Sequence, residues 1–183
     1  MTTTDLGALE RRVRDALVAV PDPEIPTCSI VDLGMVERIE VGVDSVDVDL
    51  LPTFVGCPAK DVIGRDVERA VVAVAGDRAV RVRFVYDPPW TTERITAAGR
   101  AGLRKLGITP HWENAAATGA PVAVPLLRRA GVGCPYCGST DTVLDAPFGP
   151  TPCRTTHFCR ACRNPFEGFK EKEPRCPPAS TTR

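Results

Sequence analysis

The chain has 183 residues, enough for one ordinary domain and a small appendage. Hydrophobic residues make up 43% of it and charged residues 25%, which excludes a largely disordered chain and predicts a packed core. The 23 basic residues balance the 23 acidic ones and form no basic stripe, which argues against a nucleic-acid partner. No apolar run is long enough to span a membrane, and no apolar signal core follows Met1, so we expect a cytoplasmic protein.

Apolar periodicity predicts a small α+β domain in the first part of the chain. A helix is expected from Asp5 to Val18 with Thr4 as its N-cap, because apolar residues recur there at helical spacing. Three prolines over 21–26 predict a rigid loop at 22–26, since proline excludes helix and inner strand. Next we expect two strands joined by a hairpin turn, a helix, a strand and a last helix, over 35–41, 46–50, 58–74, 79–86 and 91–106. This αββαβα order predicts helices packed against a three-stranded sheet.

The rest of the chain differs in composition and predicts a separate unit. We divide the sequence into an α+β domain over 1–110, a linker over 111–130, a β zinc ribbon over 131–172 and a flexible tail over 173–183. Six of the eight cysteines fall in the last 50 residues. In a reducing cytosol, dense paired cysteines indicate a bound metal rather than disulfides.

Two cysteine pairs carry the strongest chemical signal in the sequence. Cys134 and Cys137 form one pair, Cys159 and Cys162 form the other, and 21 residues separate the pairs. Four thiolates satisfy tetrahedral zinc, and the spacer predicts a hairpin with strands near 142–144 and 155–158. The alternative is a pair of redox dithiols, which would need a βαβ context that is missing here. A site closed by four thiolates is structural, because no coordination position remains for a substrate.

Three further residues near the ribbon leave alternatives open. Cys153 could replace one of the four ligands, lie nearby as a free thiol, or be buried. His157 could be a ligand, although packing is the commoner role when four thiolates are available. Cys176 lies in a Pro-rich end and is expected to be inert.

Cys57 is the candidate reactive group of the first domain. It precedes Pro58, and proline is common at the first helical position, so the pattern predicts Cys57 as an N-cap. There the helix dipole and unpaired amides would favour the thiolate, which could take up sulfur or hold iron. The alternative is that Cys57 serves as a small apolar residue at a tight turn. The spacing alone supports both interpretations equally.

Several motifs resemble the metal–sulfur cluster biosynthetic domain. The similarity covers about 6–107 and rests on four segments: Asp-Pro-Glu-Ile-Pro at 22–26, Val-Asp-Leu-Gly-Met-Val at 31–36, Gly-Cys-Pro at 56–58 and Asp-Pro-Pro-Trp-Thr at 87–91. The cysteine ribbon that follows, with Phe-Gly-Pro-Thr-Pro-Cys at 148–153 and Asn-Pro-Phe-Glu-Gly-Phe-Lys at 164–170, narrows the resemblance to the PaaD family. Proteins of that family accompany the multicomponent phenylacetyl-CoA ring 1,2-epoxidase.

The resemblance implies a maturation factor for metal centres of that epoxidase, such as the iron–sulfur cluster of its reductase. Cys57 would then hold iron or a cluster transiently, with Asp22 and Glu24 as acidic neighbours. From the residues alone, Asp22 and Glu24 in a Pro-rich loop are more typical of turn-formers than of ligands. Cys28 falls where the family pattern has no cysteine, which favours a packing role.

The competing function is a non-catalytic structural subunit of the epoxidase complex. Both functions imply protein partners among the oxygenase or reductase components and no nucleic acid or membrane, and a homodimer through the small sheet is compatible with either. An enzyme is disfavoured, because the sequence has no Ser-His-Asp set, no phosphate loop and no open metal site.

Overall fold

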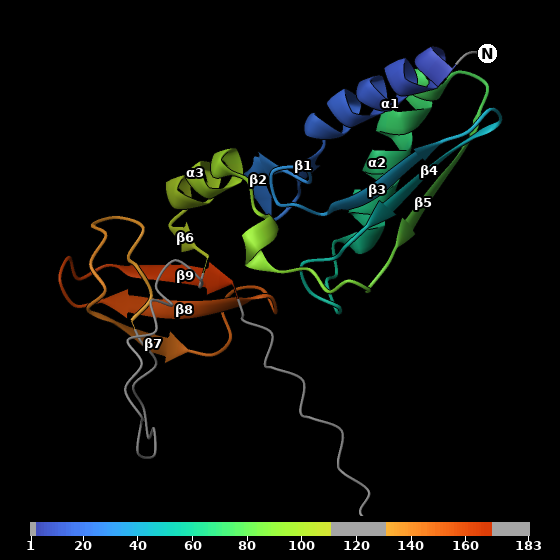
Figure 1. Cartoon of the computed structure of the whole chain (residues 1–183). Helices are drawn as coiled ribbons and strands as arrows, with labels where there is room; N and C mark the ends of the chain where they lie inside the picture. Colours follow the sequence, from blue (N-terminus) through green and yellow to red (C-terminus); the bar gives the residue numbers. More distant parts are fainter. Residues whose placement is uncertain (1–2, 111–130, 170–183) are drawn as a thin grey trace, which may run out of the picture.

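The computed structural model describes residues 3–110 and 131–169 (Figure 1). The expected linker, tail and Cys176 lie outside the described residues. The helices are α1 (Thr3–Val18), α2 (Lys60–Ala75), the 3-10 helix η1 (Thr92–Arg94) and α3 (Ala97–Lys105). The strands are β1 (Pro21–Asp22), β2 (Ile25–Ser29), β3 (Val36–Val41), β4 (Ser45–Leu50), β5 (Ala79–Phe84), β6 (Ile108–Thr109), β7 (Thr142–Ala146), β8 (Arg154–Cys159) and β9 (Pro165–Phe169).

The expected α+β domain is confirmed, with helices packed on a three-stranded sheet. The sheet has the order β3-β4-β5, in which β3 and β4 are antiparallel and β4 and β5 are parallel across α2. Val46 and Val48 on β4 are fully buried in the main core, which also contains residues of α1 and α2. Gly76 ends α2 with a φ of 68°, a conformation that glycine adopts without strain.

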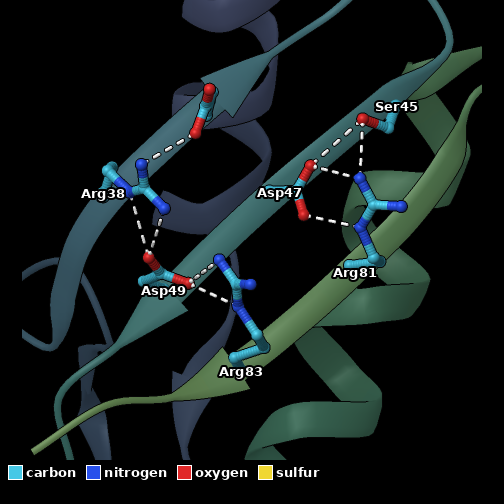
Figure 2. Close-up of polar contacts among 7 residues, drawn as sticks. Arg38, Ser45, Asp47, Asp49, Arg81 and Arg83 are labelled. Carbon is cyan, nitrogen blue, oxygen red and sulfur yellow. Dashed lines mark hydrogen bonds and ion pairs between the residues drawn. The ribbon is translucent and has the colours of Figure 1, made fainter.

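Acidic residues of β4 alternate with these buried valines and form a ladder of ion pairs (Figure 2). Asp49 accepts from Arg38 on β3 at 3.0 Å and from Arg83 on β5 at 2.9 Å. Asp47 pairs with Arg81 on β5 at 2.6 Å. Partly exposed pairs of this kind add little stability. The ladder instead determines the surface charge of the sheet. Each of these arginines faces a carboxylate, so the ladder presents no basic stripe.

The Pro-rich segment after α1 is a β-hairpin, so the prediction of a loop over 22–26 was wrong. β1 and β2 pair antiparallel as a sheet of their own. In a two-stranded sheet both strands are edges, and an edge strand tolerates proline at positions whose missing N–H would face outward. Pro23 lies between the two strands, and Pro26 on β2 is exposed. The hairpin holds Asp22 in a buried position.

Two helix boundaries also differ from the prediction. The helix α2 begins at Lys60 with Ala59 as its N-cap, so Cys57 lies in the preceding turn and is not the N-cap. The expected helix over 91–106 is interrupted at Ile95, whose backbone is extended and whose side chain is buried. A second start follows, where Thr96 accepts from the Gly99 backbone N–H at 3.0 Å and caps α3.

The ribbon is fused to the first domain by a shared sheet. The predicted hairpin is confirmed as β7 and β8, and β9, which the pattern did not predict, joins it. Parallel pairing of β6 with β9 extends this sheet to the order β6-β9-β8-β7 (Figure 1). Phe169 at the end of β9 is buried in the core of the first domain, where its ring lies 5.5 Å from that of Trp90. Side-chain packing therefore continues from one domain into the other.

Candidate functional site

The four predicted zinc ligands converge on one point. The sulfurs of Cys134, Cys137, Cys159 and Cys162 all lie within 4.8 Å of one another. The Cys134–Cys162 and Cys137–Cys159 sulfur pairs are each 3.6 Å apart. Four sulfurs bound tetrahedrally to zinc at about 2.3 Å would lie about 3.8 Å from each other. The donor set and its spacing therefore fit a zinc ion.

Two short turns hold these sulfurs in place. In the first, the Gly138 N–H donates to the Cys134 carbonyl at 2.9 Å, and Gly138 has a φ of 74°. In the second, the Arg163 N–H donates to the Cys159 carbonyl at 2.8 Å, with Arg163 at a φ of 62°. Both turns therefore close in the same way, with the residue after the cysteine pair in the left-handed region.

The four thiols differ in their affinity for a proton. The Asn164 side chain hydrogen-bonds the Cys162 sulfur and lowers the pKa of that thiol to about 6. The Ser139 backbone N–H lowers the pKa of Cys137, but burial and the neighbouring sulfurs together raise it to about 12. Four crowded thiols therefore do not all ionise by themselves, and a divalent cation at their centre would replace the protons that remain.

Cys153 and His157 are not part of this four-sulfur cluster. His157 is buried, its ring stacks on Phe166 at 5.2 Å between centroids, and it shares a hydrogen bond with Thr155 at 2.9 Å. That is the packing role favoured by the sequence. Cys153 is partly buried, with its sulfur 3.1 Å from the Thr151 hydroxyl.

Cys57 lies in the turn that leads to α2, half-buried beside the main core. Burial raises the pKa of its thiol, the Ala59 backbone N–H lowers it in part, and the carboxylates of Asp22 and Glu24 raise it further. The shift runs against the expected stabilised thiolate, because burial outweighs the Ala59 N–H and α2 begins only at Lys60. A cation bound there would replace the proton and offset the charge of the thiolate.

The hairpin β1–β2 brings its acidic residues to the same place. The Asp22 carboxylate accepts the Glu24 backbone N–H at 2.8 Å, as a turn-former does. Asp22 is also buried, and burial raises the pKa of its carboxyl, while backbone N–H groups and the Arg154 guanidinium lower it in part. Glu24 is exposed. The charges of both carboxylates raise the pKa of the Cys57 thiol. That the three residues share an iron site stays a prediction.

Sequence reasoning missed one residue of this region, Arg154 at the start of β8. It is 7% exposed, and its guanidinium donates to the Glu24 backbone carbonyl at 2.9 Å and to the Glu167 carboxylate at 2.8 Å. The only hint in the sequence is its position next to Cys153. Its contact with Glu24 joins residues 130 positions apart, which no local pattern can predict.

Cys28 and one residue from each of two family motifs, Asp32 and Trp90, have structural roles. Cys28 is buried, and its thiol donates to the Gly99 carbonyl at 3.3 Å, which confirms packing. Asp32 accepts from the Ser29 hydroxyl at 2.8 Å and stabilises the turn after β2. Trp90 is buried, and its indole N–H donates to the Leu33 carbonyl at 2.8 Å.

Among the residues that the structure describes, no helix combines the length and apolar character needed to cross a bilayer.

Comparisons with known proteins match each half of the chain separately. The iron-sulfur cluster assembly protein family matches residues 10–84, and the PaaD zinc beta ribbon domain matches residues 119–170. A solved structure of a domain of unknown function, DUF59, from Bacillus anthracis is 27% identical with a TM-score of 0.52. That likeness covers 56% of this chain and 97% of the other.

Two curated relatives extend these matches. An "Fe-S protein maturation auxiliary factor" from Porphyromonas gingivalis is 36% identical over 81 residues, which is 44% of this chain and 76% of the relative. An Escherichia coli protein, named as one subunit of a "Putative 1,2-phenylacetyl-CoA epoxidase", is 37% identical over 155 residues, which is 84% of this chain and 88% of that protein. Since this second match spans both halves, the chain belongs to the PaaD family, in which an iron–sulfur cluster assembly domain is joined to a zinc ribbon.

Proposed function

We propose that this protein delivers iron, as an ion or in a cluster, to metal centres of the multicomponent phenylacetyl-CoA ring 1,2-epoxidase and does no chemistry on the organic substrate. The observation that carries the proposal is a half-buried thiol, Cys57, that lies outside the four-sulfur cluster and feels the charges of Asp22 and Glu24. Family membership supports it, because residues 10–84 match the iron–sulfur cluster assembly protein family and 84% of the chain aligns with a protein named as an epoxidase subunit.

The four ribbon thiols and the single thiol of Cys57 differ in their surroundings, and the difference suits two separate roles. The ribbon offers four sulfurs within 4.8 Å of one another, a complete tetrahedral set, whereas Cys57 is a thiol among carboxylates. Burial raises the Cys57 pKa above its ordinary value. Thiolate is the form that binds metal, so protons compete with a cation at Cys57 and weaken its hold. The ribbon would keep its zinc permanently, while the Cys57 site would bind iron reversibly and release it to a recipient.

The ribbon would serve as the docking element in this function. Its four thiolates leave zinc no open position, so the ion supplies shape and no reaction step. Hydrophobic side chains remain exposed on the ribbon, including Tyr136 and Phe148, which is compatible with a protein recipient such as a reductase or oxygenase component.

The second candidate function is a non-catalytic structural subunit of the epoxidase, favoured because the Escherichia coli relative is named as a component of such an enzyme. It predicts a stable complex of fixed stoichiometry with the oxygenase components. A carrier predicts a transient complex that does not survive size-exclusion chromatography.

Elemental analysis of protein purified without oxygen tests the metal-binding step. After Fe(II) loading and desalting, the wild type should carry about one zinc per chain together with iron. The Cys57→Ser variant should keep the zinc and lose at least ~10-fold in iron affinity, because a serine hydroxyl is a poor iron ligand at neutral pH. Cys28→Ser is the matched control, because the Cys28 thiol donates a hydrogen bond to the Gly99 carbonyl in the core. Equal iron in the wild type and Cys57→Ser would exclude Cys57 as the carrier residue.

A further inference from the structure

The strand β5 forms one edge of the three-stranded sheet, and its outer side carries no strand in the part of the chain that the structure describes (Figure 1). Ala79 at its start and Val85 just after its end donate their backbone N–H groups to carbonyls on the β4 side, at 2.9 and 2.8 Å. Because backbone groups alternate in direction along a strand, those of Val80, Val82 and Phe84 face the outer side. Through these groups a further strand can pair with β5.

A groove of about 600 Å³ runs between this edge and α2. Its helix wall includes Lys60 and Gly64, and its strand wall is formed by residues 80–84. On β4, Val46 and Val48 are fully buried, whereas the apolar residues that lie opposite them on β5 are only partly buried. The apolar face of the sheet therefore continues to its edge and is partly uncovered there.

Gly64 keeps this groove open. A glycine inside a helix is less favourable than an alanine. A Cβ atom at this position would lie 3.6 Å from the Phe84 ring, which is an ordinary van der Waals contact, so packing within the chain does not require glycine here. The missing side chain leaves room beside Phe84 for a side chain of a partner.

The arginines of β5 determine which charge this edge accepts. Arg81 and Arg83 each bind an aspartate of β4, and their side chains remain 58% and 53% exposed. In each guanidinium, Nε and Nη2 bind the aspartate, while the third nitrogen points away from it (Figure 2). A carboxylate opposite each arginine, on a strand added at the outer side, can bind this third nitrogen.

A second copy of this chain is a poorer occupant of the edge than an acidic strand. Antiparallel pairing of two β5 strands with their apolar faces on the same side would place arginine opposite arginine, and like charges in that position are destabilising. The strand that already fits β5 is β4, whose Asp47 and Asp49 lie opposite Arg81 and Arg83, with Val48 between them. Alternating acidic and apolar residues are therefore the pattern that complements β5.

We propose that the outer edge of β5 binds an extended segment of a protein partner, in which acidic and apolar residues alternate, as an additional strand of the sheet. The acidic side chains of the segment bind Arg81 and Arg83, and its apolar side chains fill the groove. The Lys60 end of the groove adjoins the turn that contains Cys57, since Lys60 donates to the Val55 carbonyl at 3.0 Å. Binding of the segment does not depend on whether Cys57 carries iron.

The test is an NMR titration of isotope-labelled, zinc-loaded protein with a capped peptide, Ser-Val-Asp-Val-Asp-Leu, which has the sequence of β4. Saturable shifts are expected for the backbone amides of Val80, Val82, Phe84 and Gly64. The same peptide with lysine in place of both aspartates should bind at least ~10-fold more weakly, because it brings like charges to the arginines.

Two variants test whether the groove is the binding site. Gly64→Leu fills the groove and should weaken peptide binding by ~10-fold or more, while the fold is kept because leucine is a better helix former than glycine. Ala73→Leu is the matched control and should bind as the wild type does, because Ala73 is exposed and lies on the opposite side of α2 at helical spacing. Cys57→Ser should also bind the peptide normally.

Several results would overturn this inference and leave the proposed function standing. These are shifts confined to β3, the other edge of the sheet, equal binding of the lysine peptide, and unchanged binding by Gly64→Leu. Failure of the aspartate peptide to bind would overturn it as well, and self-association of the protein in that case would assign the edge to a second copy. Loss of iron binding in Cys57→Ser is a separate result, which tests the proposed function alone.

Discussion

Replacing Cys159 with serine is expected to empty the ribbon of zinc and unfold β7, β8 and β9. The Cys159 side chain is completely buried, and its sulfur lies 3.6 Å from that of Cys137. Over the described residues, the ribbon's own hydrophobic cluster contains four buried residues, two of which are ligands: Val132, Cys134, Cys159 and Phe166. Zinc binding in small domains of this kind is worth about 10–16 kcal/mol, far more than such a cluster can replace.

The loss should reach the first domain as well. Without the ribbon, β6 loses β9, its partner strand, and Phe169 leaves the core beside Trp90. We expect zinc analysis to give less than about a tenth of the wild-type content and the ribbon amides to lose dispersion in a two-dimensional NMR spectrum. Cys153→Ser is the matched control and should retain zinc. A Cys159→Ser protein with a folded ribbon and no metal would show that zinc is dispensable for this fold.

Replacing Trp90 with alanine is expected to destabilise the protein by about 3–5 kcal/mol, the usual cost of removing a buried aromatic side chain. The indole is 4% exposed, donates to the Leu33 carbonyl at 2.8 Å and packs on Phe169. Its removal leaves a cavity where the two domains meet and a buried carbonyl without this donor. Chemical denaturation of the zinc-loaded protein measures the effect.

Two control variants separate the contributions of Trp90. Trp90→Phe keeps a ring against Phe169 and loses the hydrogen bond, so it should cost about 1–3 kcal/mol. Val43→Ala removes a side chain that is 64% exposed and should change stability by less than about 0.5 kcal/mol. If Trp90→Ala lowered the free energy of unfolding as little as Val43→Ala, the contact between Trp90 and Phe169 would not stabilise the association of the two domains.

The four-cysteine cluster could be predicted from the sequence because its geometry is local. In each pair, the two residues between the cysteines form one short turn. The 21-residue spacer between the pairs then needs only to return as a hairpin. The three-stranded sheet was predictable for a similar reason, since Val46 and Val48 alternate with Asp47 and Asp49 along one strand.

The surroundings of Cys57 could not be predicted to the same degree. The N-cap interpretation depended on where α2 begins. Because α2 starts at Lys60 and not at Pro58, Cys57 is not at the helix N-terminus, where the dipole would stabilise its thiolate. The loop interpretation of 22–26 excluded helix and inner strand but did not consider an edge strand, which accepts proline. Arg154 reaches the β1–β2 hairpin through its hydrogen bond to the Glu24 carbonyl, and the ribbon joins the first domain where β6 pairs with β9. These are long-range contacts that leave no periodic trace.

The most direct test of delivery by Cys57 is the iron content of epoxidase reductase and oxygenase components produced together with this protein in one host. Components co-produced with the wild type should be fully loaded, whereas those co-produced with Cys57→Ser should carry several-fold less iron although the variant is folded and retains zinc. Full loading with Cys57→Ser would contradict delivery through Cys57 and leave the structural-subunit function as the better explanation.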